Sequence, residues 1–338
     1  MTSPKFALDC VAPLNSRVEL IGGVRRGLLS RPRFLSPWMF YDSRGSLLFE
    51  RITHLPEYYL TRTEHGILAD SADEILGGVR ADGSEPLRVV ELGAGTARRT
   101  AILLRVIVRQ RGEVLYIPID VSVDALQTAC EDLASLLPQV LVEPVVTNYV
   151  THPLRLNFFE GTTLVVYLGS SIGNFSPDEA QAILRNLSSQ LRPGDVLLLG
   201  TDLVKDESIL LDAYDDKEGL TAKFNRNILC RLNRELGADF DPAHFAHRVV
   251  WNRSASRIEM HLESEREQRV RIAQAALDLR FEQFETIHTE NSYKFTHNTI
   301  QMLLEESGFA VEQIRMDCNE WYALALARVR GPKRTSVL

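Results

Sequence analysis

From Leu87 onward, apolar stretches as long as a strand alternate with stretches of helical periodicity, and this alternation limits the possible fold more than any other feature. The predicted strands cover residues 87–92, 114–119, 140–146, 164–168 and 196–200, and the predicted helices between them cover 98–110, 123–136 and 177–191. This order is typical of a parallel sheet whose strands are connected by helices. We therefore expect an α/β fold with a doubly wound sheet.

A second kind of pattern begins after Asp202 and ends near Thr296. It contains two predicted helices, followed by three short stretches in which polar and apolar residues alternate, at 248–251, 257–263 and 268–272. Such alternation is typical of antiparallel strands with one solvated face. Beyond Thr296 the sequence again predicts a helix and two strands, in the style of the first pattern.

These changes of pattern predict two domains. One comprises residues 63–203 plus 294–330 and contains the doubly wound sheet. The other, a mixed α+β domain, comprises residues 14–62 plus 204–293. Doubly wound sheets bind ligands at the carboxyl ends of their strands. We expect the second domain to lie over that edge and to bind part of the substrate.

The composition argues against several classes of protein. The chain has 45 acidic and 38 basic residues, a formal charge of −7, whereas nucleic-acid binding needs a basic surface. No apolar stretch approaches the roughly 20 residues that span a bilayer. The four cysteines, Cys10, Cys130, Cys230 and Cys318, form no CxxC pair and no zinc-ligand spacing. We expect a cytoplasmic monomer that binds no metal, nucleic acid or membrane.

The first chemical signal is the segment Glu91-Leu92-Gly93-Ala94-Gly95, which joins a predicted strand to a predicted helix. Glycines allow the chain to turn sharply there and let a ligand approach the backbone closely. Asp120 ends the next predicted strand, and a carboxylate at that place can accept hydrogen bonds from both hydroxyls of a ribose. Together these features predict a nucleoside-binding site.

The identity of the nucleoside depends on position 98. A dinucleotide-binding turn has a third glycine there, for close packing under a pyrophosphate, but this chain has Arg98. S-adenosylmethionine (S-adenosyl-L-methionine) carries no phosphate, so the observed segment favours it over NAD(P), and an NAD(P)-dependent oxidoreductase is disfavoured. Two more segments belong to the same predicted site: Asn148-Tyr149, expected to lie against the adenine, and the glycine- and serine-rich loop 169–175, expected near the methyl group.

Several longer signatures, taken together, resemble the histidine Nα-methyltransferases of ergothioneine biosynthesis. The resemblance extends from about residue 20 to 328 and rests on YDSRGS at 41–46, LPEYYLTRTE at 55–64, GN at 173–174, AYDD at 213–216 and TENSYKF at 289–295. It implies a Rossmann-type class I methyltransferase sheet with a second, mixed α+β substrate-binding domain. It also implies that S-adenosylmethionine methylates the α-amine of L-histidine three times, giving hercynine.

The resemblance also implies roles for individual residues. The methyl donor would be bound by Gly93, Arg99, Asp120, Asn148 and Tyr149. Histidine would be bound by Tyr58, Gly169, Asn174, Tyr214, Met260, Glu290 and Ser292, with Asn174 and Tyr214 near its carboxylate and Glu290 and Ser292 at its imidazole. Tyr41 and Asn174 are the implied catalytic residues, with Tyr41 near the amine and the sulfonium.

Two departures from the family pattern concern the donor alone. The family commonly has an acid where this chain has Asn148, and a lysine where it has Arg99. An amide oxygen accepts the same hydrogen bond without the charge, so a weaker affinity for the donor is expected. The histidine-binding positions are unaffected by these departures.

Three other interpretations remain open from the sequence. A related fungal branch methylates a tryptophan-derived amine, but Glu290 and Met260 favour an imidazole over an indole. A non-catalytic module that binds S-adenosylmethionine would not need the amino-acid-binding residues. Glu290 could instead form a surface ion pair with Lys294. The histidines, which include no HxxH pair, are expected to be structural rather than metal ligands.

Overall fold

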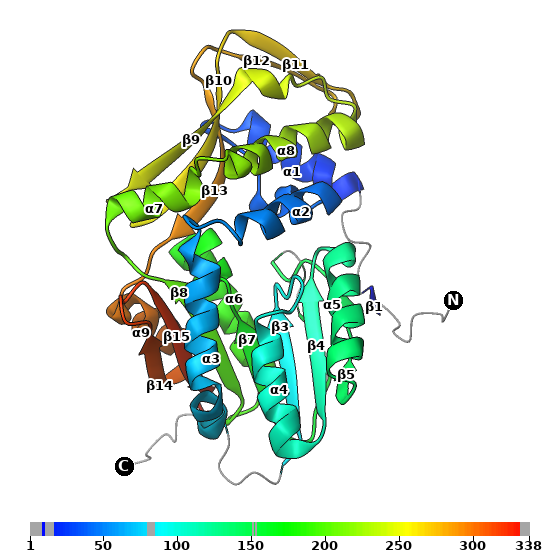
Figure 1. The fold of residues 1–338 in the computed structure, drawn as a ribbon. Coiled ribbons are helices and arrows are strands. Elements are labelled where there is room, and N and C mark those ends of the chain that lie inside the picture. The colour runs from blue at the N-terminus through cyan, green and yellow to red at the C-terminus, as the bar shows by residue number, and fades with distance from the viewer. Residues whose placement is uncertain (1–8, 11–16, 80–84, 151, 153, 332–338) are drawn as a thin grey trace, which may run out of the picture. The chain divides into compact units, whose positions relative to one another are not determined.

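The chain forms two compact units in a computed structural model that describes residues 9–10, 17–79, 85–150, 152 and 154–331. Unit 1 comprises residues 1–12, 62–204 and 295–338, and unit 2 comprises residues 13–61 and 205–294. Figure 1 shows the elements of both units. None of the described helices is long and apolar enough to cross a membrane.

Unit 1 is built on a mixed sheet of nine strands in the described residues, in the order β1-β6-β4-β3-β7-β8-β15-β14, with β5 paired to β4. The strands are β1 (Asp9–Cys10), β3 (Leu87–Leu92), β4 (Val114–Asp120), β5 (Val140–Val142), β6 (Val145–Val146), β7 (Thr162–Tyr167), β8 (Val196–Asp202), β14 (Phe309–Met316) and β15 (Tyr322–Val329). Neighbours from β6 to β8 are parallel, whereas β15 is antiparallel to both β8 and β14. This is the expected α/β doubly wound sheet, with its order reversing between β3 and β7.

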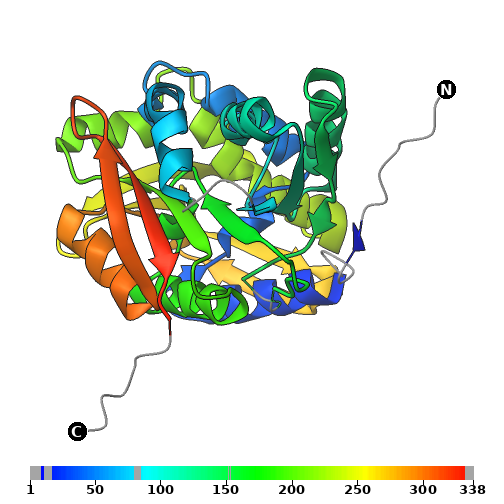
Figure 2. The same ribbon diagram turned by 90° about the horizontal axis from the view of Figure 1, so that it is seen from below.

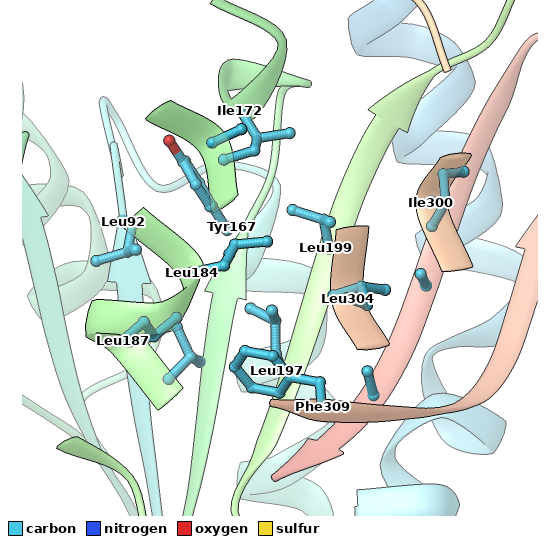
Figure 3. Close-up of a cluster of buried hydrophobic side chains, with 14 of the residues drawn as sticks. Leu92, Tyr167, Ile172, Leu184, Leu187, Leu197, Leu199, Ile300, Leu304 and Phe309 are labelled. Carbon is cyan, nitrogen blue, oxygen red and sulfur yellow. The ribbon is translucent and has the colours of Figure 1, made fainter. Parts of the chain in front are cut away.

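Helices cover both faces of this sheet. Figure 2 shows α3 (Tyr59–Val79), α4 (Thr100–Arg111) and α5 (Val123–Leu136) on one side, and α6 (Pro177–Gln190) and α9 (His297–Glu306) on the other. Figure 3 shows side chains of α6 and α9, among them Leu184 and Leu304, packed with Leu197 and Leu199 of β8 in a buried cluster. Strands buried on both faces explain why the sequence of this unit has continuous apolar stretches.

Unit 2 has a four-stranded sheet in the order β2-β13-β10-β9 and a hairpin of β11 and β12. Its elements are α1 (Arg17–Leu29), β2 (Arg33–Phe34), α2 (Ser43–Ile52), α7 (Glu207–Tyr214), α8 (Leu220–Leu236), β9 (Phe245–Asn252), β10 (Arg257–Ser264), β11 (Gln268–Ile272), β12 (Leu277–Phe281) and β13 (Thr286–Tyr293). The alternating stretches predicted from the sequence are β9, β10 and β11; β10 is antiparallel to β9 and to β13, and β11 is antiparallel to β12. Along β10 every second residue is buried, and α8 contacts β10 and β9.

Two parts of the predicted element pattern differ from the structure. The expected strand at 140–146 is divided into β5 and β6, and Pro144, which cannot donate a backbone hydrogen bond, lies in the gap. Strands β12 and β13 were not expected from the sequence. In β13 the buried positions include Thr289 and Ser292, so the apolar alternation that predicts a half-buried strand is missing there.

Candidate active site

The glycine turn after β3 adopts a backbone conformation that glycine tolerates best. Gly93 and Gly95 have φ angles of 68° and 53°, in the left-handed region. The amide nitrogens of Gly93 and Ala94 both donate to the carbonyl oxygen of Ile119, at 2.8 and 3.1 Å. The turn is thereby attached to the end of β4, which carries Asp120.

Asp120 holds the turn with one carboxylate oxygen and the next helix with the other. Oδ2 accepts from the amide of Gly95 at 2.8 Å, and Oδ1 accepts from the amide of Ser122 at 2.8 Å. Burial raises the pKa of Asp120, although these backbone hydrogen bonds oppose the shift. Each carboxylate oxygen has a second lone pair, so the fixed carboxylate retains the capacity to accept from two ribose hydroxyls.

Asn148 and Tyr149 follow β6 and lie near the same turn. The Asn148 side chain is 5% exposed, and its Oδ1 accepts from the amide of Val150 at 3.1 Å. The Tyr149 hydroxyl donates to the Tyr167 hydroxyl at 3.2 Å, and a Cβ atom on Gly93 would lie 3.5 Å from the Tyr149 oxygen. The ends of β3, β4 and β6 and the start of their loops thus come together, as the sequence predicts.

Arg99 and Gly169 are joined by a residue that the sequence analysis did not assign to the site. Glu64 of α3 is fully buried; its Oε2 accepts from Arg99 Nη1 at 2.9 Å, and its Oε1 accepts from the amide of Gly169 at 2.9 Å. The Tyr322 hydroxyl donates to the same Oε1 at 2.5 Å. Gly169 has a φ angle of 74°, and a Cβ atom there would lie 3.0 Å from the Arg99 guanidinium.

Asn174 lies in the short 3-10 helix Ser171–Asn174 that follows Gly169. Ser170 precedes it with a φ angle of 56°, and the Ser170 hydroxyl accepts from the amide of Asp202 at 2.9 Å. The loop after β7 is therefore attached to β8 through Ser170 and to α3 through Glu64. Asn174 and Gly169 consequently belong to unit 1, together with the residues expected to bind the donor.

Unit 2 contains a buried triangle of polar side chains. The Tyr214 and Ser292 hydroxyl oxygens are 2.7 Å apart, and Lys294 Nζ donates to Ser292 at 2.8 Å and to Tyr214 at 3.0 Å. Lys294 is 4% exposed, so the interpretation of a surface ion pair with Glu290 is wrong. Since only one hydroxyl hydrogen can lie between the two oxygens, the other hydroxyl hydrogen is directed outside the triangle.

Glu290 lies one alternate position away from Ser292 on β13, directly opposite Met260 of β10. Burial raises the pKa of Glu290 to about 8, although the positive charge of Lys294 opposes this shift. The hydroxyl of Thr289 donates to the carbonyl oxygen of Met260 at 3.0 Å and fixes this pair of strands. Glu290 thus combines a carboxyl group that titrates near neutrality with an apolar neighbour, Met260.

Aromatic rings connect Tyr41 to this cluster. Tyr41 makes an edge contact with Phe49 at a centroid distance of 5.8 Å, Phe49 contacts Tyr58 at 6.1 Å, and Tyr58 contacts Tyr214 at 6.3 Å. All four belong to unit 2. Ring faces attract cations, so this group suits an ammonium that gains methyl groups.

The structure therefore gathers the predicted site residues into two clusters, one in each unit. The donor cluster in unit 1 comprises Gly93, Arg99, Asp120, Asn148 and Tyr149, and unit 1 also contains Gly169 and Asn174, which the resemblance assigns to histidine; the amino-acid cluster in unit 2 comprises Tyr41, Tyr58, Tyr214, Met260, Glu290 and Ser292. Glu64 and Lys294 were missed. Alternation along a strand could have indicated Lys294, because residues 290, 292 and 294 share one face. Glu64 ends the signature at 55–64, but its role could not be read from that segment because its partners are remote in sequence.

Comparison with known proteins agrees with these features. The family described as "Histidine-specific methyltransferase, SAM-dependent" matches residues 20–329. The histidine N-alpha-methyltransferase of Mycolicibacterium smegmatis is 43% identical over 84% of this chain and 87% of its own length. The protein of the same name from Mycobacterium tuberculosis is 41% identical over 84% of this chain and 87% of its own length.

A more distant relative carries a different substrate in its name. The 4-dimethylallyltryptophan N-methyltransferase of Claviceps purpurea is 24% identical and covers 90% of this chain and 93% of its own length.

Proposed function

Because the chain belongs to the family of histidine-specific, S-adenosylmethionine-dependent methyltransferases, we propose that it methylates the α-amino group of L-histidine three times. The product is hercynine, and the reaction is the first step of ergothioneine biosynthesis. One observation carries this proposal. Glu290 and Ser292 lie on the same strand, β13, and the buried Lys294 and Tyr214 both contact the Ser292 hydroxyl. These four side chains include groups that can hydrogen-bond to an imidazole, Glu290 and Ser292, and groups that can bind a carboxylate, Lys294 and Tyr214.

The donor cluster fits S-adenosylmethionine in the chemistry of its residues. Asp120 accepts hydrogen bonds from the ribose hydroxyls, and the glycine turn leaves room for the ligand beside the backbone. Asn148 and Tyr149 bind the adenine. When bound, S-adenosylmethionine would supply the methyl group of its sulfonium: a bond forms from the amine nitrogen to the methyl carbon, the carbon–sulfur bond breaks in line with it, and the sulfur leaves as a neutral thioether.

In the proposed site Arg99 has a structural role in addition to its positive charge. Its guanidinium is paired with the buried Glu64 and covers Gly169, so it stabilises the loop after β7. In the proposed site this loop lies beside the methyl-donating end of the ligand, and Asn174 at its far end binds the carboxylate of histidine. Glu64 is then a positioning residue for Arg99 and for the loop after β7.

The amino-acid cluster explains selection of histidine. Glu290 exchanges a hydrogen bond with one imidazole nitrogen, and Ser292 with the other. An amino acid without ring nitrogens leaves these buried polar groups unpaired, at a cost of about 1–3 kcal/mol for each group. Lys294 and Tyr214 bind the carboxylate at the other end of the substrate, with Tyr58 packed against Tyr214.

The α-amine must lose a proton before each transfer, because only the neutral amine has a lone pair. The Tyr41 hydroxyl lies near the amine in the proposed site and passes this proton to solvent. Its ring, with those of Phe49 and Tyr58, attracts the methylated ammonium as the charge becomes permanent. Alignment of amine and sulfonium and exclusion of water supply most of the rate enhancement.

We also propose that the protein acts as a cytoplasmic monomer. The spacing of its cysteines, without a disulfide framework, suits a reducing compartment, and its acidic net charge of −7 suits a small-molecule substrate rather than nucleic acid.

Mass spectrometry of L-histidine incubated with the protein and S-adenosylmethionine tests this function. We expect a gain of one, two and finally three methyl groups on the α-nitrogen. L-tryptophan serves as the competing acceptor, and an Asp120→Ala variant serves as the control for donor dependence. Donor binding measured by calorimetry without any methylated histidine would instead support a non-catalytic binding module and overturn the proposal.

A further inference from the structure

A cluster of three potential metal ligands lies on the sheet of unit 2. Glu259 and His261 are alternate residues of β10, and His288 of β13 is the register partner of His261, directly after an irregularity in the pairing of the two strands. Each of the three offers one ligand atom, and these atoms lie within 4.8 Å of one another. Sequence spacing could not reveal the cluster, because β10 and β13 are separate in the chain.

One pair of ligand atoms in the cluster has the spacing found in a zinc site. His261 Nε2 and Glu259 Oε2 are 3.2 Å apart, and the two imidazole rings have a centroid distance of 4.9 Å. Bonds of about 2.0–2.1 Å arranged as a tetrahedron place neighbouring ligand atoms roughly 3.3 Å apart. His261 Nδ1 is buried and has no hydrogen-bond partner. The ring nitrogen that faces Glu259 is Nε2, and it makes no hydrogen bond other than this contact in the described residues.

Hydrogen bonds from neighbouring groups hold His288 and Glu259 in place, as hydrogen bonds commonly hold the ligands of a metal ion. His288 Nε2 is 3.0 Å from the carbonyl oxygen of Glu290, which fixes the ring and leaves Nδ1 as the coordinating atom. The other carboxylate oxygen of Glu259 accepts from Asn252 at 2.8 Å and from Arg257 at 2.7 Å. Glu259 can thus offer Oε2 to a cation while Oε1 remains bound to the protein.

We propose that Glu259, His261 and His288 form a binding site for a divalent transition-metal ion of the zinc class. Two imidazoles and one carboxylate suit Zn²⁺, Co²⁺ or Ni²⁺ and disfavour Mg²⁺ and Ca²⁺, which prefer oxygen ligands alone. Three protein ligands leave a fourth position for water. The site is separate from the proposed methyl-transfer chemistry, but His288 connects it to the backbone of Glu290.

Titration of the chelator-treated protein with Co²⁺, followed by visible absorption, tests the proposal without reference to activity. We expect one equivalent to bind with the intense absorption of a tetrahedral site, to be displaced by Zn²⁺ and to be unaffected by excess Mg²⁺. His261→Ala and His288→Ala should each weaken binding at least about tenfold. Glu259→Gln provides a milder variant that keeps the shape of the side chain.

His244→Ala is the matched control, because His244 of the same unit also lies beside two carboxylates, Asp241 at 3.4 Å and Glu265 at 3.8 Å. Circular dichroism should show that each variant is folded. Loss of the signal in His261→Ala and His288→Ala, with His244→Ala unchanged, supports the site. Absence of tetrahedral binding by the original protein, or loss in His244→Ala alone, overturns it and leaves the three residues as a hydrogen-bonded network.

Discussion

Asp120 illustrates how one side chain serves both the fold and the proposed donor site. Replacement by alanine removes the acceptors for two ribose hydroxyls, and hydrogen bonds to a charged group contribute about 1.5–3 kcal/mol each. It also removes the acceptor for the Gly95 amide. We expect Asp120→Ala to weaken binding of S-adenosylmethionine in calorimetry by at least about tenfold. Asp120→Asn, which retains one oxygen, should be intermediate, and unchanged affinity in both variants would remove Asp120 from the site.

Glu290 and Met260 should determine the choice between histidine and tryptophan. Glu290→Ala removes a charge-assisted hydrogen bond to the imidazole, at a cost of about 1.5–3 kcal/mol, or roughly a factor of 10 to 150 in recognition. It also removes a carboxyl group that an indole would have to desolvate. Combined with Met260→Val, it enlarges the space opposite β13. We expect the ratio of histidine to tryptophan methylation to fall at equal donor concentration, with donor affinity unchanged.

If that ratio does not fall, the imidazole is bound elsewhere and Glu290 is a structural residue. Met260→Val alone separates the effect of volume from that of charge, because it leaves Glu290 in place.

The raised pKa of Glu290 predicts a dependence of stability on pH. Between the ordinary value of 4.5 and about 8, the folded protein retains a proton that the unfolded chain has lost. Stability from this group is therefore complete below pH 4.5 and falls as the pH rises through 8. Glu290→Gln does not titrate, so its stability relative to the original protein should increase from pH 5 to 8, by no more than about 4 kcal/mol. Denaturant unfolding at several pH values measures the difference, and a constant difference would contradict the assignment.

At the scale of elements, Glu64 connects α3 to the loop after β7 and to β15. Its carboxylate accepts from Arg99, from the Gly169 amide and from Tyr322, and it is fully buried. Removing one partner of a buried ion pair costs about 3–5 kcal/mol. We expect Glu64→Ala to lower the free energy of unfolding by this order and to weaken donor binding.

Glu64→Gln separates the positioning role from general stability. Its amide oxygen can still accept from Gly169 or Tyr322, but it lacks the charge that pairs with Arg99. If Glu64 positions the donor site, the KM for S-adenosylmethionine should rise in Glu64→Gln even at temperatures where the variant is fully folded. An unchanged KM would limit Glu64 to a structural role.

The elements of the doubly wound sheet could be predicted closely because their signals are local. Apolar stretches gave β3, β4, β7 and β8, and the predicted helix at 123–136 is α5. These strands are buried on both faces, so hydrophobicity alone marks them. In β13, by contrast, buried Thr289 and Ser292 interrupt the apolar pattern, and their hydrogen bonds are made with residues remote in sequence.

The same distinction holds for the candidate site. Gly93, Gly95 and Asp120 lie in a local strand–turn–helix pattern whose chemistry can be read directly. The amino-acid-binding residues were assigned by resemblance, since a tyrosine or serine alone carries no such pattern. Glu64 and the pair His261 and His288 acquire their significance only through tertiary contacts, which a single sequence does not contain.

At the scale of the whole molecule, the described chain passes between the units at residues 61–62, 204–205 and 294–295. The last of these crossings separates Lys294, which is bonded to Tyr214 and Ser292, from Phe295, whose amide donates to Asp202 at 2.8 Å. The backbone on either side of this crossing is thus hydrogen-bonded within its own unit, Lys294 in unit 2 and Phe295 in unit 1.

The rate of methyl transfer should rise with pH on the alkaline side of neutrality. Three protons must leave the substrate nitrogen in succession. The proposed site has Tyr41 rather than a strong base near the amine, so a larger neutral fraction of the amine should increase the rate. In single-turnover experiments with both substrates saturating, we expect the rate to increase between about pH 7 and 9.

Glu290, with a pKa of about 8, also becomes ionised in this interval and then accepts more strongly from the ring N–H, which acts in the same direction. The Glu290→Gln variant separates the two contributions, because it retains deprotonation of the amine and loses that of the carboxyl group. If the rate still rises with pH in the variant but less steeply, both the amine and Glu290 contribute to the rise. An equal rise in the two proteins attributes it to the amine alone. A flat profile in both proteins would show that the neutral fraction of the amine does not limit the transfer.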